Sequence, residues 1–219
     1  MTFIFQLFNK RKLDYYPRYY YYEILLDKYR DGLFYSNLIN NLKKTDGIKT
    51  DTEIRLVDVD NKIPNEVVIN DIIRKYGKPN NKIIYEDLFE IKVLFYRQKL
   101  GEHKTKVEFH FFRNNLFFYT YTFSYLNLEN KNEIIQIIKE KYLEGKSEDI
   151  INNFITSNLS YIVDKNKNII LYNDSIDFSI YYYCDNKKII EKIMESIDFM
   201  KVKNEIKQKR NKWMLYKKL

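Results

Sequence analysis

A run of apolar and aromatic residues at positions 116–123, LFFYTYTF, constrains the fold more than any other part of this sequence. Successive side chains of a β-strand point to opposite faces, and neither face of this run suits water. The strand is therefore expected either to lie in the centre of a sheet covered on both sides or to present aromatic surface to a partner. One predicted face carries Phe117, Tyr119, Tyr121 and Phe123, and the other carries Leu116, Phe118, Thr120 and Thr122.

Two shorter segments before this run alternate with the same period. Residues 90–96 place Ile91, Val93 and Phe95 on one side. In residues 107–111, Glu108 and His110 lie opposite the apolar residues, so both are predicted to face water. Residues 113–115, Arg-Asn-Asn, favour a turn. The stretch 71–126 thus predicts the end of a helix, a stop at a Gly and a Pro, and then an antiparallel meander of aromatic-rich strands.

A similar order of elements follows in the second half of the chain. We predict a fold of the α+β class, with meander sheet strands packed against helices and a long basic C-terminal helix. The chain 1–219 forms one domain, or two related helix–meander modules at about 61–130 and 131–200 with a helical extension at 201–219. The expected helices cover residues 36–44, 65–76, 132–144, 147–156 and 186–216, and the further strands cover 54–59, 159–163, 169–172 and 175–183.

The order helix, Tyr-Gly-Lys-Pro (residues 76–79) and meander resembles that of small α+β binding modules such as β-lactamase inhibitor proteins. The resemblance covers about a quarter of the chain and includes no functional motif. It implies an α+β binding module, and no residue roles are carried over from it.

Charge is concentrated at the C-terminus. Residues 201–219 hold eight basic side chains and one acidic side chain, so they account for +7 of the formal net charge of +8. A basic helix with interleaved aromatic rings can neutralise phosphates and stack on bases. A solvated terminal helix is the alternative, and the apolar positions look too interrupted for a membrane-surface helix. The predicted partner-binding residues are Lys203, Lys207, Lys209, Arg210, Lys212, Trp213 and Tyr216.

The sequence gives little support for catalysis. The two histidines, His103 and His110, are predicted to lie on the surface, and five glycines form neither a dinucleotide-binding nor a phosphate-binding loop. The strongest enzymatic alternative is a metal-dependent nuclease that uses Glu90-Ile91-Lys92 on a strand, with Asp58, Asp60 or Asp87 as further ligands. However, Glu-x-Lys recurs at several other places in this highly charged chain, so chance explains it. We predict no catalytic residues, no metal and no cofactor.

The compartment is predicted from what the sequence lacks. The single cysteine, Cys184, rules out an intrachain disulfide and is expected to be a packed thiol. The N-terminus has a short apolar run before its basic cluster, unlike a secretory signal, and no stretch has the roughly 20 apolar residues of a membrane span. We therefore expect a cytoplasmic protein without a membrane partner.

These observations favour a non-enzymatic binding protein. It would engage an acidic macromolecule through the C-terminal helix and aromatic surface. The partner would be RNA, DNA or a nucleoprotein such as a nuclease complex that the chain inhibits, or another protein. The alternatives are the metal-dependent nuclease and a structural scaffold that buries its exposed aromatic residues by self-association.

Overall fold

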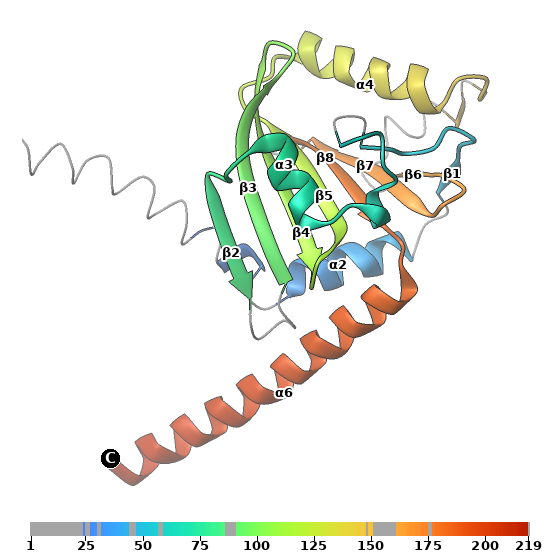
Figure 1. Cartoon of the computed structure of the whole chain (residues 1–219). Helices are drawn as coiled ribbons and strands as arrows, with labels where there is room; N and C mark the ends of the chain where they lie inside the picture. The colour runs from blue at the N-terminus through green and yellow to red at the C-terminus, as the bar shows by residue number, and fades with distance from the viewer. Residues whose placement is uncertain are drawn as a thin grey trace, which may run out of the picture.

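One eight-stranded sheet forms the centre of the molecule, with helices on both faces (Figure 1). The computed structural model describes residues 24, 27–29, 32–43, 47–56, 59–85, 91–147, 149–150, 161–174 and 177–218. The strand order is β1-β6-β7-β8-β5-β4-β3-β2, and neighbours are antiparallel except for the parallel pair β1 and β6. The prediction of an α+β fold is confirmed.

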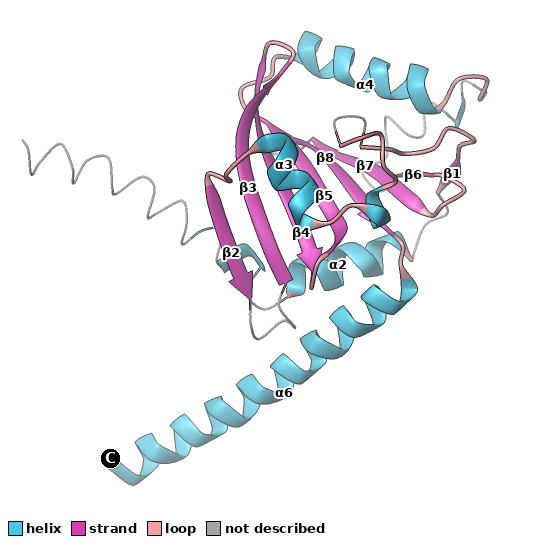
Figure 2. Ribbon diagram, in the orientation of Figure 1, coloured by secondary structure: helices cyan, strands magenta, loops and turns pink. Residues whose placement is uncertain are grey.

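The elements alternate between helical and extended segments along the chain (Figure 2). The strands are β1 (Ile48–Lys49), β2 (Asn81–Tyr85), β3 (Ile91–Leu100), β4 (His103–Phe112), β5 (Asn115–Phe123), β6 (Tyr161–Val163), β7 (Asn168–Asp174) and β8 (Phe178–Cys184). The helices are α2 (Leu33–Leu42), the 3₁₀ turn η1 (Pro64–Glu66), α3 (Ile69–Tyr76), α4 (Leu128–Tyr142) and α6 (Lys187–Lys218).

The two faces of the sheet are covered by different helices. Helix α2 and the first half of α6 pack on one face, where Ile39, Ile193 and Ile197 join buried side chains of the central strands. Helices α3 and α4 cover the other face in two separate clusters, one around Ile72 and one around Ile138. The core is therefore present on both sides of the sheet, and its central strands have no water-facing side.

Strand β5 is one of these central strands, as the sequence predicts. It pairs with β4 on one side and β8 on the other, and Leu116 through Thr120 are almost completely buried. The predicted faces are wrong at its beginning because of a β-bulge. His110 pairs with Phe118 while Phe111 pairs with Leu116, so Phe117 is an extra residue in the ladder. Phe117 therefore packs with Phe118 on the α2 face, and Leu116 packs with Tyr119 in the α3 cluster, whereas the later residues keep their predicted faces.

The helix predictions are largely confirmed, and α6 most closely. The apolar residues of its first half pack against the sheet, with Ile193 and Ile197 fully buried. The helix predicted at 65–76 is interrupted: η1 comes first, and α3 begins at Ile69. On α3, Ile72 is buried and Ile73 is exposed. Of the helix predicted at 147–156, residues 148 and 151–156 lie outside the described part of the chain.

The strand predicted at 54–59 is wrong for its described residues. Leu56 forms only a bridge to Lys62, and Val59 donates its backbone N–H to the carbonyl oxygen of Leu56. The backbone N–H of Ile54 donates instead to a side chain, Oδ2 of Asp164, at 2.9 Å. Because its hydrogen bonds are local or made to side chains, this apolar segment packs as a loop. Val57 and Asp58 are outside the described residues.

Strands of the two predicted modules belong to one sheet, since β5 pairs with β8. Each module contributes one side: β2 to β5 lie on one side of that pairing, and β6 to β8 on the other. The relation between the modules as repeats stays a prediction.

A buried carboxylate holds the loop before η1 to the β6–β7 turn. Asp164 is 4% exposed and accepts hydrogen bonds from the backbone N–H groups of Ile54, Asn166 and Asn168, and from the side-chain amide of Asn168. All four donors lie within 3.1 Å of its oxygens. This one side chain therefore connects segments that are more than a hundred residues apart in the sequence.

Asp164→Ala is expected to lower the free energy of unfolding by roughly 3 kcal/mol, because it leaves several buried donors without an acceptor. Urea denaturation followed by circular dichroism measures the change. Asp51→Ala, at an exposed bend, is the control and should change stability by less than about 0.5 kcal/mol. Equal effects of the two substitutions would contradict this role for Asp164.

Candidate partner-binding helix and a buried polar cluster

Helix α6 has two halves with different surroundings. Up to Met200 it packs on the sheet, and from Lys201 to Lys218 every residue is exposed. Figure 1 shows this second half projecting away from the sheet. At 1.5 Å per residue it extends about 27 Å beyond its last packed residue. An exposed helix of this length gains little stability from tertiary contacts.

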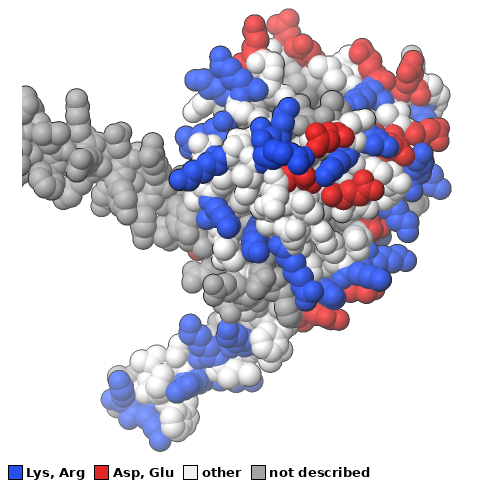
Figure 3. Space-filling view, in the orientation of Figure 1, with Lys and Arg blue, Asp and Glu red and all other residues white. Residues whose placement is uncertain are grey.

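The predicted partner-binding residues all lie on this projecting half. In Figure 3 blue side chains gather along it, whereas both signs of charge are mixed over the body. Lys203, Lys207, Lys209, Arg210 and Lys212 are all exposed. The structure therefore brings the predicted basic residues together on a single exposed helical segment.

The aromatic residues of this half are exposed as well. Trp213 is 55% exposed and Tyr216 is 84% exposed. Nζ of Lys217 lies 3.9 Å from the centre of the Trp213 ring, within the range of a cation–π contact. An exposed indole beside a lysine can interact with either a base or another apolar side chain.

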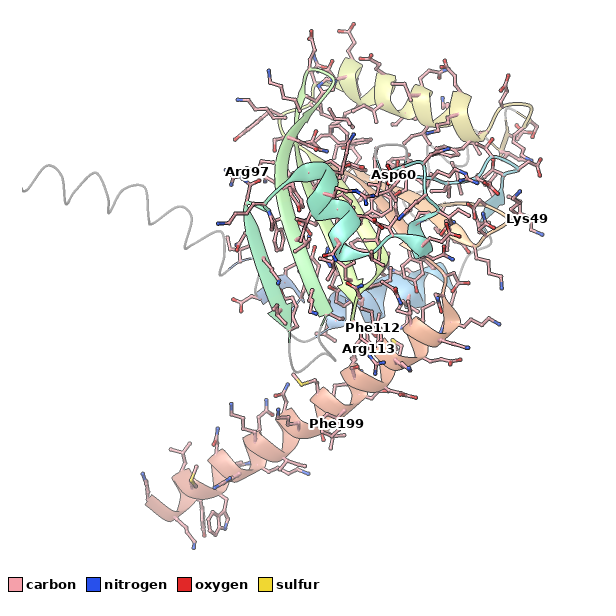
Figure 4. The ribbon with its side chains drawn as sticks, in the orientation of Figure 1. Lys49, Asp60, Arg97, Phe112, Arg113 and Phe199 are labelled. Carbon is pink, nitrogen blue, oxygen red and sulfur yellow. The ribbon has the colours of Figure 1, made fainter. Side chains whose placement is uncertain are left out.

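Sequence reasoning missed Phe199 as part of this surface. Figure 4 shows it on α6 below the turn marked by Phe112 and Arg113. Phe199, Val202 and Ile206 are all more than half exposed. The helical spacing of these residues from Trp213 was the available signal.

A second polar feature is fully buried against the α2 face of the sheet. Glu108 and His110 point from β4 toward Tyr29 and Tyr35, and His110 is 0% exposed. The prediction that Glu108 and His110 face water is therefore wrong. The alternation in β4 is as predicted, but residues around Tyr29 and α2 cover the second face.

The contacts between these four side chains indicate which of their polar atoms carry protons. Tyr29 donates its hydroxyl to Oε2 of Glu108, and the Tyr35 hydroxyl lies 2.8 Å from Nδ1 of His110. Nε2 of His110 is 3.4 Å from Oε2 of Glu108. A neutral imidazole with its proton on Nε2 fits this arrangement, because Nδ1 then accepts from Tyr35 and the Nε2 proton faces the carboxylate, although Nε2 is too far away or misaligned for a regular hydrogen bond.

Burial shapes the titration of each group. It lowers the pKa of His110 and raises the pKa values of Tyr29 and Tyr35 well above the ordinary value, so all three stay neutral at pH 7. Burial alone would also raise the pKa of Glu108, but hydrogen bonding from His110 and the charge of Lys28 outweigh it and lower that pKa to about 2. Nζ of Lys28, 3.7 Å from Oε2 of Glu108, is the nearby positive charge. The cluster is one carboxylate held by surrounding donors, and it anchors Tyr29 and α2 to the sheet.

A cavity of about 490 Å³ lies between α4 and the β3–β4 turn. Its lining includes His103, the half-buried first residue of β4, together with Ile134 and Tyr182. The lining is mostly apolar, with Glu102, Glu133 and Lys141 among its polar residues. Cys184 is a packed thiol, as predicted, and burial raises its pKa above the ordinary value.

The proposed nuclease residues are only partly placed. Lys92 is half-buried on β3, and Asp60 forms an exposed ion pair with Arg74. Glu90, Asp58 and Asp87 lie outside the described residues. Within the described ranges, His, Cys, Asp and Glu form no group of three that could hold a metal ion. The N-terminal apolar run and the tyrosine-rich segment 15–26 lie in residues 1–26, of which only residue 24 is described.

Among the helices that the structure describes, none has both the length and the apolar character required to span a bilayer. Cytoplasmic location stays a prediction.

Comparison with known proteins adds no relative. No protein-family model, no curated protein and no solved structure matches the chain, so the resemblance to β-lactamase inhibitor proteins stays an expectation from the sequence.

Proposed function

We propose that this chain is a non-enzymatic binding protein that engages an acidic macromolecule, nucleic acid or a nucleoprotein, through the projecting half of α6. One observation carries this proposal: seven of the eight net positive charges lie on a helical segment in which every described residue is exposed. Lysines at this density attract phosphates, and each contact releases counterions.

The nucleoprotein form of the proposal includes inhibition of a nuclease complex, by occupying the surface that its nucleic acid would use. It relies on the same basic residues. Lys203, Lys207, Lys209, Arg210 and Lys212 supply the charge, and Trp213 and Tyr216 were predicted to stack. The lysine-rich composition favours charge contacts over the bidentate recognition typical of arginine.

Removing residues 201–219 should abolish salt-sensitive binding to nucleic acid. The full chain and a chain ending at Met200 are compared by fluorescence anisotropy, with labelled single-stranded RNA and duplex DNA at low and high salt. The shorter chain retains all the packed residues of α6, so circular dichroism should show an intact body. Undiminished binding by the shorter chain would contradict the proposal. Absence of binding by both chains would exclude direct nucleic-acid contact.

A further inference from the structure

From Phe199 onward, α6 carries a seven-residue repeat of large side chains that runs along its projecting half. Each seven-residue unit has a large side chain at its first position and another at its fourth position, which is the spacing of the a and d positions in a coiled coil. Five of the six positions are apolar or aromatic, and all of these are more than half exposed. The first positions are Phe199, Ile206 and Trp213, and the fourth positions are Val202, Lys209 and Tyr216.

This stripe faces away from the protein's own sheet. Ile193 and Ile197 are fully buried against the sheet. Val202 and Ile206 each follow one of them by nine residues, which at about 100° per residue is half a turn of the helix. A second helix can therefore lie along the stripe without meeting the body that α6 is packed on.

We propose that the stripe is a dimerisation seam, in which the projecting halves of two copies of this chain pair as a parallel, in-register coiled coil. The flanking charges select this partner. In a parallel pair, the residue immediately before a repeat unit on one helix faces the fifth residue of that same unit on the other helix, five positions further along the sequence. Asp198 then faces Lys203 of the second copy, and Glu205 faces Arg210 of the second copy.

An antiparallel pair lacks this complementarity. It would set Lys203, Arg210 and Lys217, which recur at the same place in each repeat, against the same three residues of the other helix. Like charges in that arrangement are destabilising. Asp198 already lies 3.3 Å from Lys201 on its own helix. Exposed ion pairs of this kind contribute little stability, so this pair does not prevent Asp198 from contacting Lys203 of the second copy.

Two lysines limit the strength of the seam. Lys209 occupies a core position, where a single polar residue fixes register at a cost in stability. Lys212 faces Lys217 of the second copy, the one repulsive flanking pair in the parallel arrangement. The seam spans fewer than three full repeats, so the dimer is weak, and added salt strengthens it by screening the basic residues.

This inference does not rest on the proposed function. The seam uses the apolar stripe, whereas Lys201, Lys207 and Lys218 lie outside it and stay accessible for an acidic partner. In the dimer, Trp213 and Tyr216 pack against the second copy, so the basic side chains alone contact the acidic partner. Salt has opposite effects on the two processes, since it weakens phosphate contacts and strengthens the dimer.

The first test compares two substitutions of equally exposed residues. Ile206 is on the stripe and Leu215 is off it, and each is 61% exposed. Sedimentation equilibrium of the full-length chain should show a concentration-dependent dimer that Ile206→Asn dissociates and Leu215→Asn leaves intact. A monomer at every concentration and salt, or equal effects of the two substitutions, would overturn the proposal.

The second test reverses one flanking charge. Lys212→Glu replaces two repulsive contacts in the parallel dimer by attractive ones and should tighten it roughly tenfold. Lys207→Glu makes the same charge change on the outer side and should alter the dimer constant by less than about threefold. In the antiparallel arrangement that sets the basic residues against each other, residue 212 would face residue 212 of the second copy, so Lys212→Glu would keep a like-charge pair and would not tighten association. Equal effects of the two charge reversals on the dimer constant, or a weaker dimer with Lys212→Glu, would overturn the parallel seam. Both variants should lose nucleic-acid affinity to a similar degree.

Discussion

Glu108→Ala is expected to lower the free energy of unfolding by about 3–5 kcal/mol, the typical effect of removing one partner from a buried charged network. The substitution removes the carboxylate that the Tyr29 hydroxyl and Nε2 of His110 face, and it leaves both groups buried between the sheet and the residues that cover it. Urea denaturation at neutral pH measures the loss. Glu102→Ala, at the exposed β3–β4 turn, is the matched control and should change stability by less than about 0.5 kcal/mol. Equal effects would show that the cluster does not hold the fold.

The same cluster makes stability fall on acidification. The pKa of Glu108 is lowered from 4.5 to about 2 in the folded chain, so its contribution is present above pH 4.5 and is lost as the pH falls toward 2. The pKa of His110 is also lowered, from 6.5, by burial, so protonation favours the unfolded chain as soon as the pH drops below that value. In Glu108→Gln the acid-dependent loss between pH 4.5 and pH 2 should be reduced. An unchanged profile would contradict the charged state assigned to Glu108.

Periodicity in the sequence was sufficient to predict most of the central strands and the last helix. Residues 107–111 alternate as predicted, but alternation specifies only which side chains share a face. It does not specify what covers that face. Glu108 and His110 are buried because Tyr29 and Tyr35, about 75–79 positions earlier, pack over them. No local sequence pattern contains such a long-range contact, so the face of β4 that carries Glu108 and His110 was predicted to contact water.

Other errors have a similarly local cause. The bulge at Phe117 shifts the faces at the beginning of β5, and a bulge adds one residue without altering the apolar character of the run. Residues 54–56 have the composition of a strand, but the Asp164 carboxylate takes the N–H of Ile54. For the candidate binding helix, the sequence predicted the charge of residues 201–219. It did not reveal that the helix projects from the body or that Phe199, Val202 and Ile206 form a stripe.

Neutralising four basic residues of α6 is expected to reduce nucleic-acid affinity at low salt by roughly a hundredfold or more. The variant carries Lys203→Ala, Lys207→Ala, Arg210→Ala and Lys212→Ala together. Alanine favours helix, so the projecting half should keep its conformation. The matched control removes the same charge from the body through Lys75→Ala, Lys78→Ala, Lys99→Ala and Lys104→Ala, all at exposed positions. If binding depends on α6 rather than on net charge, only the first variant should lose affinity.

The salt dependence of this binding tests the central claim most directly. For the full-length chain on duplex DNA, the slope of log affinity against log salt reports the number of phosphates neutralised. The account predicts that the α6 variant reduces the magnitude of this slope by about 3–4, and that the body variant leaves it within about one unit. Equal slopes for the wild type and the α6 variant would contradict a role for the projecting helix in binding nucleic acid.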